Sequence, residues 1–198
     1  LWPKIASRFK ATSVWLGLEK GIKRLSDLNI IMAILLLAFI LLVGPTLFMV
    51  EMGFDSLGHM AQNFIRMSTW TDPLGTSNFV ESWTVFYWAW WLALGPYMGI
   101  FITKISKGRT LKQLILGCVC FGTLGCFLFF SILGNYAAYL ELNGLFPVLE
   151  TLESQGPPAL IVAVLGTLPM SSLILVVFTL VCVIFAATSY DSASYTLA

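Results

Sequence analysis

Long stretches without charged residues dominate this sequence of 198 residues. Only 11% of its residues are charged, against about 25% in an average soluble domain. No Asp, Glu, Lys, Arg or His occurs between Asp27 and Glu51, Glu81 and Lys104, Lys112 and Glu141, or Glu153 and Asp191. Each gap holds the roughly 20 apolar residues that a spanning helix needs. We therefore expect an all-α integral membrane protein with four transmembrane helices, over residues 30–50, 83–103, 114–139 and 159–190.

The basic residues fall on alternate sides of these predicted helices. Ten of the eleven Lys and Arg residues lie either in residues 1–29 or in the 104–113 loop, and the other is Arg66. By the positive-inside rule we expect both ends of the chain, 1–29 and 191–198, to be cytoplasmic. Segments 51–82 and 140–158 are then extracytoplasmic connections, the first with a possible amphipathic helix over 54–67. Because topology accounts for the charges, the net charge of +1 indicates no nucleic-acid partner.

The residue patterns of enzymes are missing. The sequence has no Gly-rich phosphate loop, no nucleophile paired with a base and no pair of carboxylates on one helical face. The four cysteines lie within predicted spans and form no Cys-x-x-Cys pair, so neither metal nor redox use is expected. We expect no enzyme and no cofactor.

An aromatic cluster occupies the second predicted helix, which reads WTVFYWAWWLALGPYMG from residue 83. Trp83 stands at the outer end, where tryptophans commonly anchor a helix in the bilayer surface. Trp90 and Trp91 lie roughly 10–12 Å deeper, near the middle of the bilayer. Lipid-facing packing, helix–helix packing and the lining of a ligand cavity all remain open for them.

Gly95 and Pro96 follow the cluster at once. Proline removes a backbone donor and clashes with the preceding turn, and broken helices at the midplane often mark substrate sites in transporters. We therefore expect a helix break at Gly95-Pro96. An ordinary proline kink is the alternative, and Gly95 with Gly99 can also be a close helix contact.

The chemistry of this region favours a particular cation. No acidic residue lies inside the second or third helix to pair with an ordinary amine. Tryptophan faces attract quaternary ammonium groups, which cannot donate hydrogen bonds. A trimethylammonium compound therefore fits better than a primary amine or a sugar.

The fourth predicted helix carries a candidate ion site. Phe185, Thr188 and Ser189 are spaced i, i+3 and i+4, so one face presents a backbone carbonyl and two hydroxyls. Such oxygens suit sodium, but the hydroxyls can equally bond back to their own helix.

Several separated motifs together resemble the betaine/choline/carnitine transporter family. They are WTVFYWAWW at 83–91, ISKGRT at 105–110, GLEKGIKRLS at 17–26, GPT at 44–46 and DSAS at 191–194. The resemblance covers residues 17–198. It implies that the chain corresponds to helices seven to ten of a twelve-helix protein with the LeuT-type inverted repeat, and that the whole protein is a homotrimer.

The resemblance also implies roles for individual residues. The substrate tryptophans of the family fall on Trp90 and Trp91, an outer aromatic position on Trp83, and a pathway aromatic on Tyr97. Leu94 stands where the family often has an aromatic residue, which weakens the cage on one side. Phe185, Thr188 and Ser189 match the sodium site of the family.

The predicted function is therefore sodium-coupled symport of a quaternary ammonium solute of the glycine betaine, choline or carnitine type. The expected partners are this solute, sodium, membrane lipid and the remaining helices of the transporter, in a bacterial inner membrane. A sodium-independent exchanger of trimethylammonium compounds and a non-transporting membrane subunit are the alternatives. Residues 1–29 are read as a cytoplasmic segment or as the end of a preceding helix.

Overall fold

The computed structural model describes residues 18–75 and 78–197, which form helices joined by turns and contain no strand. Most of the predicted segment 1–29 and the last residue of 191–198 lie outside this range. Four helical stretches are long and apolar enough to cross a membrane: Lys23–Val43, Val80–Ile105, Leu111–Leu142 and Ser171–Asp191. The predicted class, an all-α membrane protein with four spans, is confirmed.

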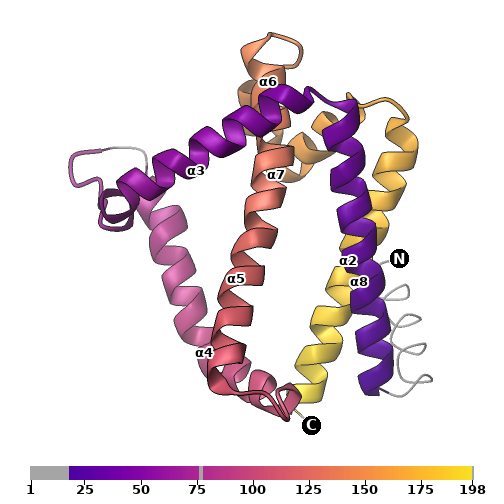
Figure 1. Ribbon diagram of the computed structural model, residues 1–198. Coiled ribbons are helices and arrows are strands. Elements are labelled where there is room, and N and C mark those ends of the chain that lie inside the picture. Colours follow the sequence, from indigo (N-terminus) through magenta and orange to yellow (C-terminus); the bar gives the residue numbers. More distant parts are fainter. Residues whose placement is uncertain (1–17, 76–77, 198) are drawn as a thin grey trace.

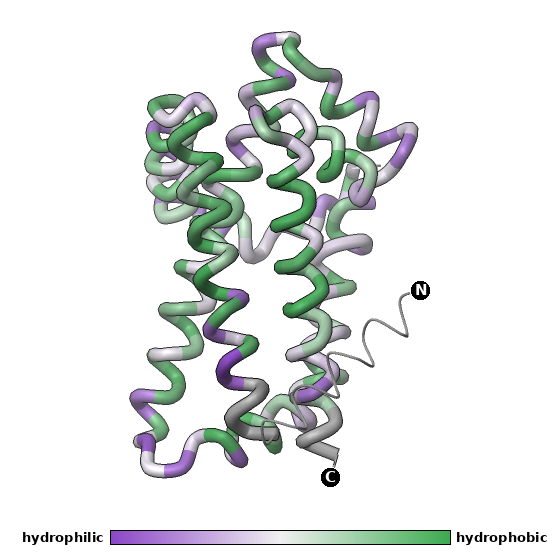
Figure 2. The backbone as a smooth tube through the Cα atoms, turned by 90° about the vertical axis from the view of Figure 1, so that its right-hand side faces the viewer, coloured by the Kyte–Doolittle hydropathy of each residue, from purple (hydrophilic) through white to green (hydrophobic). Residues whose placement is uncertain are grey.

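The elements follow one another with short connections. In chain order they are α2 (Leu18–Val43), α3 (Thr46–Ser68), the π-helical turn η1 (Val80–Val85), α4 (Phe86–Ile105), α5 (Leu111–Phe129), the π-helical turn η2 (Phe130–Gly134), α6 (Asn135–Leu142), α7 (Val148–Gly166) and α8 (Ser171–Leu197). Figure 1 shows α2 and α8 side by side, α4 and α5 joined at the lower end, and α3, α6 and α7 gathered at the upper end. In Figure 2 the middle of the long helices is hydrophobic, whereas the lower turn between α4 and α5 is largely hydrophilic.

The first span ends earlier than the predicted boundary at residue 50. α2 stops at Val43, and α3 starts at Thr46. Pro45 has no N–H to continue the helix, and it occupies the N-cap of α3. A Cβ on Gly44 would lie 2.8 Å from the Ile40 carbonyl oxygen, so this turn requires glycine. The predicted amphipathic segment 54–67 therefore belongs to a longer helix that already begins inside the predicted span.

The fourth predicted span, 159–190, is also divided. Residues up to Gly166 belong to α7, a turn follows, and α8 begins at Ser171. α7 itself is kinked at Gly156, where φ is 80° and two prolines follow. The predicted loop 140–158 is mostly helical, and the Glu141 carboxylate caps α7 by accepting hydrogen bonds from the backbone N–H groups of Val148 and Leu149.

The buried core lies at one end of the molecule, where α2, α3, α6, α7 and α8 meet (Figure 1). Its most enclosed members are Ile40, Met49 and Leu165. The Tyr136 hydroxyl is 2.8 Å from that of Thr167, which joins α6 to the end of α7. By contrast, neither α4 nor α5 has a buried residue. These two spans present most of their surface outward.

Candidate site between helices 2, 4 and 8

A cavity of about 1270 Å³ lies between α2, α4 and α8. On α4 it is lined by Trp90, Leu94 and Tyr97, which are spaced i, i+4 and i+7 and so share one face of the helix. Three of the predicted substrate residues are thus brought to one wall. An indole and a phenol ring make this wall aromatic, the surface that attracts a quaternary ammonium group.

The three predicted sodium residues line the same cavity from a different helix. Phe185, Thr188 and Ser189 of α8 line the same cavity. The Thr188 and Ser189 hydroxyls each donate to the Phe185 carbonyl oxygen over 2.9 Å. Three of the predicted substrate residues and all three predicted sodium residues therefore line one cavity, although they lie about 90 positions apart in the chain.

These oxygens can supply only part of the coordination shell of a hard cation such as sodium. A hydroxyl that donates its proton keeps its lone pairs, so Thr188 and Ser189 can still accept a cation. Hard cations take oxygen ligands in sets of about six, and this cluster supplies three at most. A sodium site built on this cluster would need further oxygens, from other residues or from water. The same two hydrogen bonds are also expected if both hydroxyls simply bond back to their own helix and hold no ion.

Two of the predicted substrate residues do not line the cavity. Trp91 projects elsewhere from α4 and is 61% exposed. Trp83 lies in η1 and stacks on Tyr87, with ring centroids 6.1 Å apart. Tyr87 in turn lies parallel to Trp90, 6.3 Å away, so Trp83 connects to the cavity through one intervening ring.

The predicted break at Gly95-Pro96 is not present. α4 runs as one helix from Phe86 to Ile105 with Pro96 inside it. Proline removes one backbone hydrogen bond, and the bonds on either side suffice to carry the helix past it. A Cβ on Gly95 or Gly99 would meet nothing within 4 Å, so these glycines make no close helix contact in the described part of the chain.

Sequence reasoning missed part of the lining. Phe101 continues the Trp90, Leu94 and Tyr97 face by one more turn, a spacing that could have identified it. Lys23 and Asp27 enter from α2, and only the tertiary packing of α2 beside α4 and α8 brings them there. The π-helical geometry of η1 was not predicted from the sequence either.

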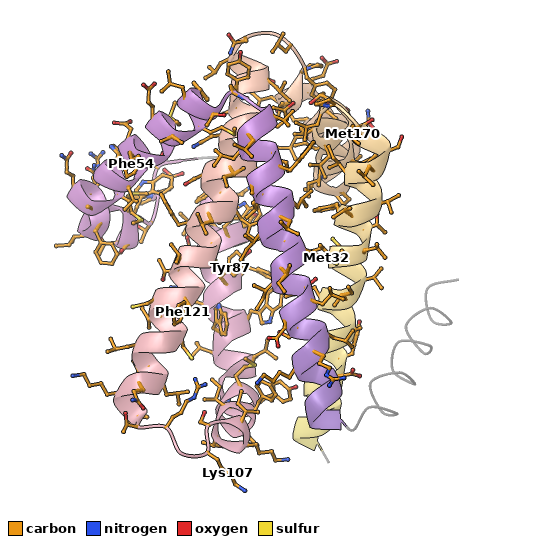
Figure 3. The ribbon with its side chains drawn as sticks, turned by 45° about the vertical axis from the view of Figure 1, so that its right-hand side comes forward. Met32, Phe54, Tyr87, Lys107, Phe121 and Met170 are labelled. Atoms are coloured by element: carbon orange, nitrogen blue, oxygen red, sulfur yellow. The ribbon has the colours of Figure 1, made fainter. Side chains whose placement is uncertain are left out.

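The end of the cavity toward the 104–113 loop is charged. Lys104 and Lys107 line it there, and Lys23 and Asp27 of α2 belong to the same lining. The loop is closed by a reciprocal cap at the start of α5: the Gln113 backbone N–H donates to the Thr110 hydroxyl, and the Thr110 N–H to the Gln113 side chain. Figure 3 shows Lys107 at the lower tip of the molecule. The cavity therefore passes from an aromatic region to a basic one.

Comparison with known protein families identifies the class of protein to which this chain belongs. The sequence model of the betaine/carnitine/choline family of transporters matches residues 5–198. The chain belongs to this family, which is a family of transporters rather than enzymes.

Individual relatives are similar over nearly the whole chain. The Escherichia coli protein called "Uncharacterized transporter YeaV" is 39% identical over 94% of the chain. A carnitine transporter of Acinetobacter baumannii and the glycine betaine transporter OpuD of Bacillus subtilis are each 37% identical over 93%. The chain spans only 39%, 34% and 36% of the lengths of these three relatives, respectively.

Proposed function

We propose that this chain is part of a sodium-coupled symporter for a quaternary ammonium solute of the glycine betaine, choline or carnitine type. One observation carries the proposal: the aromatic face of α4 and the oxygen cluster of α8 line the same cavity. A solute and an ion bound in one cavity can each favour closure around the other. The names of the relatives in Acinetobacter and Bacillus support the solute class.

In this proposal the residues have distinct tasks. Trp90 holds the trimethylammonium group by a cation–π contact, and Tyr97 lines the path one turn below Leu94. Trp91 completes the cage together with residues of the whole protein that this chain does not contain. Phe185, Thr188 and Ser189 supply part of the sodium shell. The 104–113 loop and both chain ends face the cytoplasm of a bacterium, and the whole protein assembles as a homotrimer.

An exchanger of two trimethylammonium compounds without sodium is the second candidate. It is favoured by the hydrogen bonds of Thr188 and Ser189 to the Phe185 carbonyl, which satisfy both hydroxyls without an ion. The two candidates differ in whether sodium changes the affinity for the solute.

Calorimetric titration of the purified full-length protein tests both the solute class and the coupling. We expect glycine betaine to bind at least roughly tenfold more tightly in sodium chloride than in potassium chloride, since coupling energies are typically about 1–3 kcal/mol. Glycine, with its primary amine, should not compete. Choline and carnitine are titrated in the same way. Equal affinity in the two salts would favour the exchanger, and absence of binding by all three compounds would contradict the proposed solute class.

A further inference from the structure

The lower end of the cavity is positively charged. Below the aromatic wall formed by Trp90 and Tyr97, the same side of α4 carries Phe101 and then Lys104, and Lys107 follows in the turn. At a rise of about 1.5 Å per residue, Lys104 lies roughly 21 Å along the helix from Trp90. In the proposed function this end opens to the cytoplasm, so a solute released from the aromatic wall passes the lysines on its way out.

The charges of the cavity lining do not balance. Four charged residues of the described chain line the cavity, namely Lys23, Asp27, Lys104 and Lys107, which leaves an excess of two positive charges. Lys23 and Asp27 are one turn apart on α2, so the carboxylate is placed to offset the lysine of its own helix. Residues 82–140, which include all of α4 and α5, contain no Asp or Glu. These two helices therefore supply no second acid.

Apolar groups strengthen the effect of these charges. Met98, Phe101 and Ile105 of α4 and Phe185 of α8 line the cavity as well. A cleft that is lined by one sign of charge and has apolar walls focuses the electric field, and it can change the entry rate of a charged ligand by a factor of about 10 or more. The lower end of the cavity therefore repels a cation more strongly than lysines on an open surface do.

The expected solutes differ in the group that the lysines meet. Glycine betaine, carnitine and choline all carry a trimethylammonium group, so the aromatic wall attracts all of them in the same way. Glycine betaine and carnitine also carry a carboxylate and are neutral overall, whereas choline carries a hydroxyl and keeps a net positive charge. A carboxylate can pair with a lysine ammonium group, which offsets the repulsion of the trimethylammonium group. The charged end can therefore distinguish solutes that the aromatic wall cannot.

We propose that Lys104 and Lys107 form an electrostatic filter, which lets zwitterionic trimethylammonium carboxylates pass and slows choline. This inference rests on the proposed function, and it narrows the solute to the glycine betaine or carnitine type. The alternative is that these lysines only orient the chain in the membrane, as the positive-inside rule requires of this loop. In that case their removal changes the transport of both kinds of solute alike.

Efflux from preloaded proteoliposomes tests the filter, with the full-length protein oriented so that its cytoplasmic side faces the lumen and with sodium inside. We expect the wild type to release radiolabelled glycine betaine faster than choline at equal low concentration. In the double variant Lys104→Gln/Lys107→Gln the ratio of the two rate constants should fall roughly three- to tenfold, because choline efflux rises. The matched control is Arg109→Gln/Lys112→Gln, which removes the same charge from the same loop but outside the cavity lining. Its ratio should stay at the wild-type value.

Ionic strength gives a second readout, which a change in packing would not move. Potassium chloride is added on both sides at constant sodium. Raising the ionic strength from about 0.1 M to about 1 M shortens the Debye length from about 10 Å to about 3 Å, so choline efflux by the wild type should rise toward that of the double lysine variant. The lysine variant should respond much less, and glycine betaine efflux should change little in either protein.

Three outcomes would overturn the filter: an unchanged ratio in the lysine variant, an equal shift in the Arg109 and Lys112 control, or a wild type that releases choline at least as fast as glycine betaine. Because solute still leaves the vesicles in each of these outcomes, the proposed function would stand. If the double variant does not fold, Lys107→Gln in the exposed turn carries the test alone. A wild type that releases none of glycine betaine, carnitine and choline would overturn both proposals.

Discussion

At the scale of single residues, the proposed sodium ligands of α8 can distinguish the symporter proposal from the exchanger. Ser189→Ala removes one hydroxyl from the Phe185 cluster and leaves the helix intact. We expect the sodium concentration for half-maximal uptake to rise roughly tenfold or more, since a bond to a charged group contributes about 1.5–3 kcal/mol. At saturating sodium, KM for the solute should stay near its wild-type value. The readout is initial uptake as a function of sodium concentration.

Thr179→Ala is the matched control for this change. Thr179 stands on the same helix and donates to the Leu175 carbonyl over 2.7 Å, so it loses an equivalent back-bond outside the cavity. Its sodium dependence should equal that of the wild type. If both variants shift the sodium dependence alike, the Ser189 effect belongs to the helix and not to an ion.

The sequence predicted some of the residues that line the cavity and missed others. Trp90, Tyr97 and the α8 oxygens were named from the sequence, and each lines the cavity. Trp91 was named with Trp90, yet adjacent residues on a helix point about 100° apart, and only one of them can face α8. The lining from α2 depends on tertiary packing, which no local pattern encodes.

At the scale of elements, α4 is the helix whose prediction most needed correction. The dipeptide Gly95-Pro96 indicated a break, and the structure has a continuous helix. A proline inside a helix weakens it by about 3 kcal/mol relative to alanine without having to interrupt it. The residue therefore makes α4 easier to bend at this level, between the wall residues Leu94 and Tyr97.

Pro96→Ala tests whether transport uses this weak point. We expect a higher midpoint of thermal unfolding, because a backbone hydrogen bond is restored, together with a several-fold lower maximal rate of uptake. Betaine affinity should change little. Gly99→Ala strengthens the same helix by about 1 kcal/mol without restoring the hydrogen bond that Pro96 lacks, and it should leave the rate near the wild-type value. A Pro96→Ala protein with unchanged maximal rate would show that α4 moves as a rigid rod.

Element boundaries illustrate the limits of local signals. The uncharged gaps located all four spans because the bilayer demands that length of apolar sequence. They did not show that α2 ends at Val43, just before Gly44-Pro45, or that α7 and α8 are separate, since an apolar turn is as uncharged as a helix. Gly44 and Gly156 were visible, but their roles depend on close contact and on a positive φ.

At the scale of the whole molecule, the core and the cavity lie in different regions. The core ties α2, α3, α6, α7 and α8 together at one end, whereas α4 and α5 have no buried residue. Asp191, buried at the other end of α8, has a side-chain oxygen without a hydrogen-bond partner in the described part of the chain. The chain spans only 34% and 36% of the lengths of two of its relatives, and in the proposed whole protein further helices cover such faces.

The measurement that tests the central claim most directly is uptake of radiolabelled glycine betaine by the full-length protein in proteoliposomes. Vesicles with an inward sodium gradient are compared with vesicles that have an inward potassium gradient of equal size. We predict accumulation of betaine above its external concentration with sodium only, because the sodium gradient supplies the free energy. Equal uptake with both ions, or uptake only against preloaded betaine, would contradict sodium-coupled symport.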